Sequence, residues 1–189
     1  MKEARDHWLE QFVNEKLQQF VFLDEFGAAT NMTRTRARAP RGQRAVCKMP
    51  HGRWKVLSTI AALTVGGISC AASFDDATDT ELFVTFVREA LVPTLVPGQV
   101  VVLDNLTAHK SPRVEQLIQD AGCRLLRLPP YSPDLNPIEM AISKVKTFLR
   151  SLARGTVAGL FDGIASALAS VTATDARHFM EHCGYTAAT

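Results

Sequence analysis

The chain has 189 residues, 47% of them hydrophobic, and a formal net charge of +2. This length suits one domain, or one domain with a small appendage, and the hydrophobic share is enough for a real core, while so small a net charge says little about partners. The four cysteines lack CxxC spacing and an accompanying histidine cluster, which disfavours a zinc site and a disulfide framework. Reduced thiols in a cytosolic protein are expected.

The N-terminal part predicts a helix followed by a strand. Charged and apolar residues alternate at roughly helical spacing from Asp6 to Gln19, which predicts a short lead-in helix and not a signal peptide. Phe20–Leu23 is rich in Phe and Val and predicts a strand that ends at Asp24 and Glu25. The alternation of side chains along a strand places Glu25 on the opposite side from Asp24.

The stretch Phe26–Phe74 contains no Asp or Glu, and Pro40 and Gly42 predict a loop within it. A basic strip of this kind is the electrostatic footprint of a protein that binds a phosphate backbone, although a solvated loop with excess arginine has the same composition. Its cationic residues are Arg34, Arg36, Arg38, Arg41, Arg44, Lys48, Arg53 and Lys55.

One apolar run, Val56–Ala72, approaches the length of a membrane span. A Gly66-Gly67 pair lies at its centre, so a β-hairpin formed by Lys55–Thr64 and Ile68–Phe74 explains it better.

The remaining elements alternate between helices and strands. Val100–Leu103 is apolar at every position, which is typical of a central strand covered on both faces. The order predicts an α/β fold with a mixed sheet, antiparallel early and parallel later. The other predicted elements are a helix over Asp79–Leu91, a helix from Ser111-Pro112 to Gly122, a strand over Cys123–Leu128, a helix from Asn136-Pro137 to Gly155, and two helices in Thr156–Tyr185.

Three carboxylates stand at the ends of these elements. Asp24 and Asp104 each follow an apolar strand, and if the two strands are parallel neighbours, both side chains project into one place. Two carboxylates so close would repel each other unless a cation lay between them. The alternative is that each Asp only ends a strand or begins a turn.

Glu139 is the third carboxylate and also has a structural alternative. With Asn136 as N-cap and Pro137 at the first helical position, Glu139 occupies the reach-back position of a capping box, worth about 1 kcal/mol. The rigid Pro129-Pro130-Tyr131-Ser132-Pro133 approach suits a site more than a cap. Ser143, Lys146 and Arg150 share its helix face, either as a nucleic-acid surface or as a solvated basic one.

Two further residues remain open between a structural and a functional role. His109 is a candidate general base or phosphate contact, but a lone histidine near a helix start is often only a hydrogen-bonding structural residue. Tyr131 is a candidate for stacking on a base or sugar, and a tyrosine between prolines often only packs.

The combined motifs resemble the DDE transposases of the mariner superfamily, and most closely the bacterial insertion sequence 630 family. The resemblance rests on Phe22-Leu23-Asp24-Glu25, Leu103-Asp104-Asn105 with Ala108-His109-Lys110, the string Leu128–Glu139, and the ending His182-Cys183-Gly184-Tyr185. Thirty-four residues separate Asp104 from Glu139, the spacing that marks this branch. The chain departs from the pattern at Phe26, Met140 and Ile142.

The resemblance implies a ribonuclease-H-like fold, with a lead-in helix or linker over 1–19, the catalytic domain over 20–154 and a helical extension over 155–189. It implies that Asp24, Asp104 and Glu139 hold two Mg²⁺ or Mn²⁺ ions, with Asn105 and His109 as auxiliary residues. It further implies cutting at transposon ends and joining of the freed 3′ hydroxyl to TA-containing target DNA. The expected DNA contacts are Arg34, Arg36, Arg38, Arg41, Lys110, Lys146 and Arg150.

Expected partners are DNA, a second copy of the chain, and a separate or missing N-terminal helix-turn-helix region, without a membrane. The expected location is the cytoplasm of a bacterium, at the nucleoid. Two other functions stay open, namely a ribonuclease-H-like nuclease without strand transfer and a DNA-binding transposase remnant without catalysis. A Rossmann-type enzyme is disfavoured because no GxGxxG follows a strand.

Overall fold

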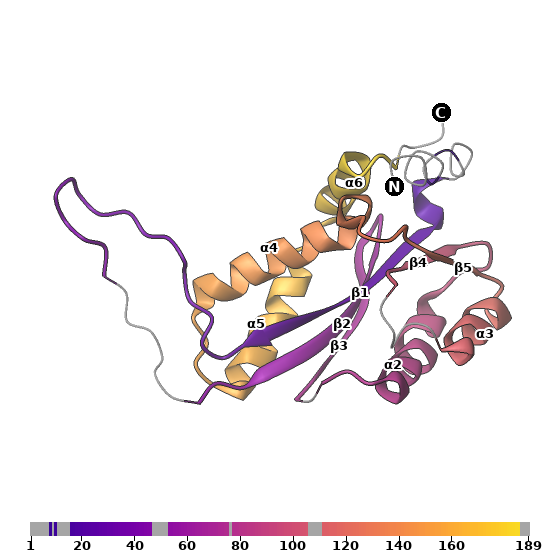
Figure 1. Cartoon of the computed structure of the whole chain (residues 1–189), viewed down its shortest axis with the longest axis horizontal. Helices are drawn as coiled ribbons and strands as arrows, with labels where there is room; N and C mark the ends of the chain where they lie inside the picture. Colours follow the sequence, from indigo (N-terminus) through magenta and orange to yellow (C-terminus); the bar gives the residue numbers. More distant parts are fainter. Residues whose placement is uncertain are drawn as a thin grey trace.

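The computed structural model describes residues 8, 10, 16–46, 53–75, 77–105 and 111–185. A five-stranded sheet in the order β3-β2-β1-β4-β5 forms the centre of the molecule (Figure 1). β1 pairs antiparallel with β2, and β2 with β3, whereas β4 runs parallel to β1 and β5 parallel to β4. The predicted mixed sheet, antiparallel early and parallel later, is therefore confirmed.

The strands and helices follow the predicted order. The strands are β1 (Phe20–Ala29), β2 (Val56–Thr64), β3 (Gly67–Phe74), β4 (Val100–Leu103) and β5 (Arg124–Arg127). The α-helices are α2 (Thr80–Phe86), α3 (Pro112–Asp120), α4 (Pro137–Leu152), α5 (Val157–Ala169) and α6 (Ala173–His182). Shorter helical turns are η1 (Leu17–Gln19), the π-helical η2 (Val87–Leu91), η3 (Val92–Thr94) and η5 (Pro133–Leu135).

β1 is longer than predicted. The strand does not end at Asp24 and Glu25 but continues to Ala29, because β2 pairs with it as far as Ala29. Its parallel pairing with β4 stops at Phe22, opposite Val102. Asp24 therefore lies within a strand, at the point where one of its two neighbouring strands has ended.

Helices cover both faces of the sheet, and a separate hydrophobic core lies on each side. One core joins alternate β1 residues such as Phe20, Phe22 and Phe26 to α4, α5 and α6. The other joins Val21 and Leu23 to α2, η2 and α3. This alternation places Asp24 on the α4 side, with Phe22 and Phe26.

The apolar run predicted to be a hairpin forms β2 and β3, joined by a turn at Val65 and Gly66. Gly67 begins β3 and does not belong to the turn as predicted. Its φ is +109°, and a Cβ there would lie 2.9 Å from the carbonyl oxygen of Val171. The α5–α6 connection can therefore approach the hairpin this closely because residue 67 has no side chain.

Most helix boundaries agree with the prediction, with two exceptions. The helix predicted over Asp79–Leu91 begins after Asp79 but changes to π-helical hydrogen bonding at Val87. α4 ends at Leu152, followed by Ala153 as its left-handed C-cap at φ 47°, and does not continue to Gly155. Of the predicted lead-in helix, most residues lie outside the described part of the chain, although Trp8 and Glu10 are helical and Leu17–Gln19 forms η1.

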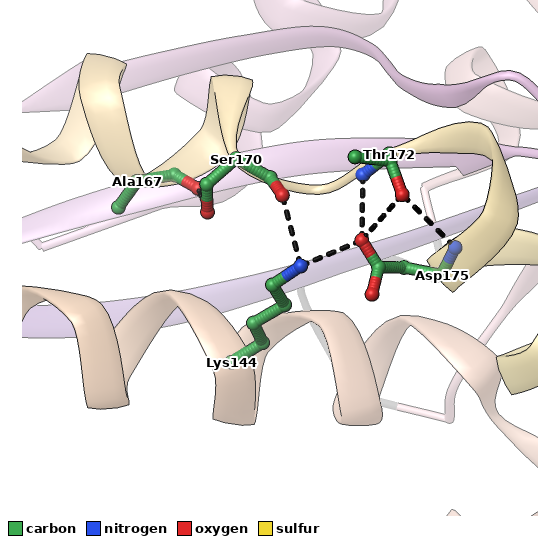
Figure 2. A network of polar contacts seen from close by, with 5 residues as sticks. All are labelled: Lys144, Ala167, Ser170, Thr172 and Asp175. Atoms are coloured by element: carbon green, nitrogen blue, oxygen red, sulfur yellow. Dashed lines mark hydrogen bonds and ion pairs between the residues drawn. The ribbon is translucent and has the colours of Figure 1, made fainter.

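α4 and α6 are joined by a polar network at the end of α5 (Figure 2). Lys144 Nζ on α4 donates to Asp175 Oδ2 at 2.6 Å and to the Ser170 carbonyl at 2.9 Å. Thr172 and Asp175 form a capping box that begins α6. The Lys144 hydrogen bond, helped by the Thr172 hydroxyl and amide, holds the pKa of Asp175 well below its usual range.

A second buried network joins both ends of the described chain to the start of α4. Trp8 Nε1 donates to the Tyr185 hydroxyl at 2.9 Å, and that hydroxyl donates to the Leu135 carbonyl at 2.8 Å. The Tyr185 ring packs against Phe20 and Phe22. Burial raises the pKa of Tyr185 well above its usual value, so the phenol stays neutral.

Among the described residues, no single helix has both the length and the apolar character needed to cross a membrane. α5 and α6 meet these criteria only when counted together, across a bend of 73°.

Candidate carboxylate site

The sheet register brings Asp24 and Asp104 to the same level. Phe22 pairs with Val102 in the parallel β1–β4 ladder, and each aspartate lies two residues further along its own strand direction. The predicted condition, that the two strands are parallel neighbours, is met. Both residues line one cavity of about 480 Å³, which also includes Glu139 at the start of α4. This cavity is called the carboxylate cavity below.

Asp24 is buried and held by two hydrogen bonds. Only 5% of the residue is exposed, and both carboxylate oxygens accept hydrogen bonds. Oδ1 accepts from the Glu25 amide at 2.7 Å, and Oδ2 accepts from Asn136 Nδ2 at 2.9 Å. The two donors come from β1 and from the residue before α4, so they fix the orientation of the carboxylate.

Asp104 and Asn105 follow β4 directly, as predicted. Asp104 is half-buried and Asn105 is exposed, and both line the carboxylate cavity. Asn105 Nδ2 donates to the Leu128 carbonyl at 2.5 Å, while the Leu128 amide donates to Leu103 at 2.8 Å. Asn105 therefore ties the segment after β4 to the connection that leads from β5 to α4.

Glu139 is the third residue of α4 and is exposed. The predicted N-cap position of Asn136 is correct, but the side chain of Asn136 makes no capping hydrogen bond to the helix. It donates instead to Asp24, so the capping box predicted as the structural role of Glu139 lacks the hydrogen bond from a helix amide to the N-cap side chain. The Glu139 side chain therefore has the surface position that a ligand-binding carboxylate needs.

The proline-rich approach to α4 forms one wall of the cavity. Pro129, Pro130 and Pro133 line it together with Tyr131 and Ser132. Tyr131 has a left-handed backbone with φ 56° and is 90% exposed. A non-glycine residue in this conformation is uncommon and costs energy. The alternative in which Tyr131 only packs is wrong, because its ring lies in solvent at the cavity.

The predicted basic contacts fall into two groups. Arg34 and Arg36 approach the C-terminal end of α4, where they line a second cavity of about 320 Å³ together with Arg150. Arg38 and Arg41 are exposed on the long segment that extends from the body of the molecule (Figure 1). Thr30 closes the base of that segment through two hydrogen bonds with Lys55.

Lys146 extends over the ring of Phe26, with Nζ 5.9 Å from the ring centroid. This cation–π contact joins α4 to β1. Phe26, a position at which the chain departs from the family pattern, therefore helps to hold the Lys146 side chain in place. His109 and Lys110 lie outside the described residues.

The donor set of the carboxylate cavity suits a hard divalent cation, because its candidate ligands are carboxylate oxygens. Among the described residues, however, no three acidic, histidine or cysteine side chains are placed to hold one ion as they stand. Asp24 is held by its hydrogen bonds, whereas Glu139 is exposed and long enough to change rotamer. A change of the Glu139 rotamer would therefore bring its carboxylate closer to a cation in the cavity.

Asn136 was missed as a site residue from sequence. Its position before Pro137 is typical of an N-cap, and nothing in the local pattern indicates a bond to a residue 112 positions earlier. The family motif that contains it was the only available signal.

The fold is similar to that of solved transposases. A Mos1 transposase paired-end complex with left transposon end matches with a TM-score of 0.78 and 15% identity, over 96% of this chain and 57% of that one. The catalytic domain of Mos1 mariner transposase matches with a TM-score of 0.63 and 12% identity, over 96% of this chain and 84% of that domain. A mariner Mos1 paired-end complex with Mg gives 0.71 and 16%, over 96% and 58%. At these identities the similarity shows the ribonuclease-H-like fold.

The chain spans a little over half the length of the transposases in the paired-end complexes. A search of curated proteins finds no match. A family model described as DDE superfamily endonuclease matches residues 19–156, which include all three carboxylates and all five strands of the described sheet. The chain therefore belongs to the DDE superfamily of endonucleases.

Proposed function

We propose that this chain is the catalytic domain of a metal-dependent DNA transposase that cuts at transposon ends and transfers the 3′ hydroxyl to target DNA. The observation that carries the proposal is the carboxylate cavity, which is lined by Asp24 from a strand, Asp104 from a strand end and Glu139 from a helix start. The family membership and the similarity to Mos1 transposase complexes support it.

Asp24, Asp104 and Glu139 would hold two Mg²⁺ or Mn²⁺ ions. Such ions, when bound, activate a water or a 3′ hydroxyl as nucleophile and stabilise the leaving oxygen of an in-line displacement at phosphorus. A similar Mos1 complex was solved with Mg and another with Mn, which supports both choices. Asp24 supplies a charge fixed by its hydrogen bonds, Asp104 a charge at the end of a central strand, and Glu139 a side chain able to adjust.

DNA would reach this site across a basic surface. Lys146 and Arg150 continue along the face of α4 from Glu139, and Arg34 and Arg36 meet Arg150 at the far end of the helix. Each arginine or lysine that contacts a phosphate releases counterions, so this surface supplies affinity without sequence selection. Arg38, Arg41 and Lys110 would extend the same contact.

The finer assignments belong to the same proposal. The family resemblance carried by the string Leu128–Glu139 favours the bacterial insertion sequence 630 branch and a TA target. With them go self-association and a separate or missing N-terminal helix-turn-helix region. The location that goes with this function is the bacterial cytoplasm, at the nucleoid. The paired-end complexes among the similar structures support DNA ends as the substrate.

The test is a cleavage and strand-transfer assay on transposon-end oligonucleotides with Mg²⁺, with and without a supplied N-terminal DNA-binding module. Asp104→Asn and Glu139→Gln are expected to abolish metal-dependent cutting while their melting temperatures stay close to wild type. Cutting without joining would favour a nuclease, and DNA binding without any cutting would favour a non-catalytic remnant. If Glu139→Gln lowers the melting temperature and spares cutting, the capping interpretation is right.

A further inference from the structure

The Asn136 side chain is buried at the wall of the carboxylate cavity and does not serve the helix that it begins. The residue is 3% exposed. Its backbone has the usual N-cap role, with its carbonyl accepting from the Glu139 amide at 3.1 Å. An N-cap asparagine normally also accepts a helix amide with its side chain, and here it makes no such bond. The side chain is therefore available for another task.

That side chain is oriented by Asp24. Nδ2 donates to Asp24 Oδ2 at 2.9 Å, and because an ionised carboxylate can only accept, this contact fixes which end of the amide faces the aspartate. The Glu25 amide holds the other oxygen, Oδ1, at 2.7 Å. The two donors come from different elements, so together they restrict rotation of the carboxylate.

The carbonyl oxygen of the Asn136 side chain, Oδ1, lies at the opposite end of the amide. Asn136 Oδ1 is buried and has no hydrogen-bond partner among the described residues. Buried polar atoms are nearly always paired in folded proteins, and each exception calls for an explanation. Asn136 lines the same cavity as Asp104 and Glu139. A neutral oxygen among carboxylates can accept a hydrogen bond from a water of a hydrated cation without adding negative charge.

We propose that Asn136 is a positioning residue of the carboxylate cavity, which orients Asp24 through Nδ2 and accepts a hydrogen bond from the hydration shell of a bound divalent cation through Oδ1. The inference rests on the proposed metal-dependent function. It adds a residue that acts through Asp24 and is not itself a ligand. Such supporting hydrogen bonds typically contribute about 10- to 100-fold to metal affinity.

The experiment measures Mn²⁺ binding to the whole chain without DNA, from the electron paramagnetic resonance signal of free Mn²⁺. Asn136→Leu keeps the approximate size and removes both polar ends, whereas Asn136→Ser keeps a good N-cap residue but is too short for the Asp24 contact. Both variants are expected to bind Mn²⁺ about 10- to 100-fold more weakly than wild type. Thr59→Val is the matched control, because it removes a different buried hydrogen bond, 2.8 Å to Ser73 on β3.

A second measurement separates positioning from mere folding. Cleavage by the Asn136 variants is expected to need more Mg²⁺ for half-maximal rate and to approach the wild-type plateau at high Mg²⁺. A purely structural role would lower the plateau without moving that midpoint, and the melting temperature would fall in parallel. If Asn136→Leu has no cooperative melting transition, Asn136→Ser decides, because serine satisfies the helix start.

Unchanged Mn²⁺ affinity in the folded Asn136→Ser protein would overturn the inference and leave the proposed function intact. If the wild type itself binds no Mn²⁺, or if Asp24→Asn binds it equally well, the metal-dependent function fails and the inference fails with it. Weaker binding in Asn136→Ser but not in Thr59→Val supports the inference.

Discussion

Removing the hydroxyl of Tyr185 tests whether the end of the chain supports the start of α4. In Tyr185→Phe the ring still packs on Phe20 and Phe22, but the bonds to Trp8 Nε1 at 2.9 Å and to the Leu135 carbonyl at 2.8 Å are lost. A typical hydrogen bond contributes about 1 kcal/mol net, so the two together give about 2 kcal/mol. For a protein of this size, that corresponds to a fall of about 4–8 °C in melting temperature.

Urea unfolding followed by far-ultraviolet circular dichroism measures the free energy of unfolding directly. The m-value should not change, because the surface exposed on unfolding is the same. Tyr131→Phe is the matched control: it makes the same chemical change at a side chain that is 90% exposed, and it should leave stability unchanged. If the two variants have equal stability, the buried network does not stabilise the fold.

Three further perturbations test other parts of the structure. Lys144 lowers the pKa of Asp175 from its ordinary value of 3.8, so the Lys144–Asp175 ion pair stabilises the fold fully above pH 3.8 and loses this effect as the pH falls toward the lowered pKa. Lys144→Met should therefore be less stable than wild type near pH 7. In acid unfolding curves, this difference in stability should shrink below about pH 4. Gly67→Ala should cost about 2 kcal/mol or more in denaturant melts because of its positive φ and the Val171 carbonyl at 2.9 Å, whereas Gly155→Ala, with open space around it, should be tolerated. Arg150→Gln should weaken DNA binding evenly across sequences and reduce the slope of log K against log salt by about 1; an unchanged slope would remove Arg150 from the phosphate-binding surface.

Local patterns in the sequence were enough to predict most elements. The continuous apolar run of β4 indicates a strand buried on both faces, so it also places Asp104 at a strand end. Pro137 and the apolar spacing of α4 indicate where that helix begins, which places Glu139 in its first turn. In both cases residues within a few positions carry the signal, because strand burial and helix initiation are local properties.

The prediction was wrong where a distant contact decides the structure. β1 continues past Asp24 because β2 supplies hydrogen bonds as far as Ala29. This pairing overrides the low strand propensity of Gly27 and Ala28. One further difference is local: α4 ends at Leu152, with Ala153 as a left-handed C-cap, before the end predicted at Gly155. The side chain of Asn136 serves Asp24 and not its own helix, through a bond across 112 positions of sequence.

By itself, the sequence determined which residues could act, their order along the chain, and membership of the DDE superfamily. Only the tertiary structure decided that Asp24 and Asp104 lie at one level of the sheet, that Glu139 faces the same cavity, and that Asn136 holds Asp24. The physical reason is that the position of a side chain within an element depends on neighbouring residues, whereas the distance between elements depends on pairing register and core packing, to which the whole chain contributes.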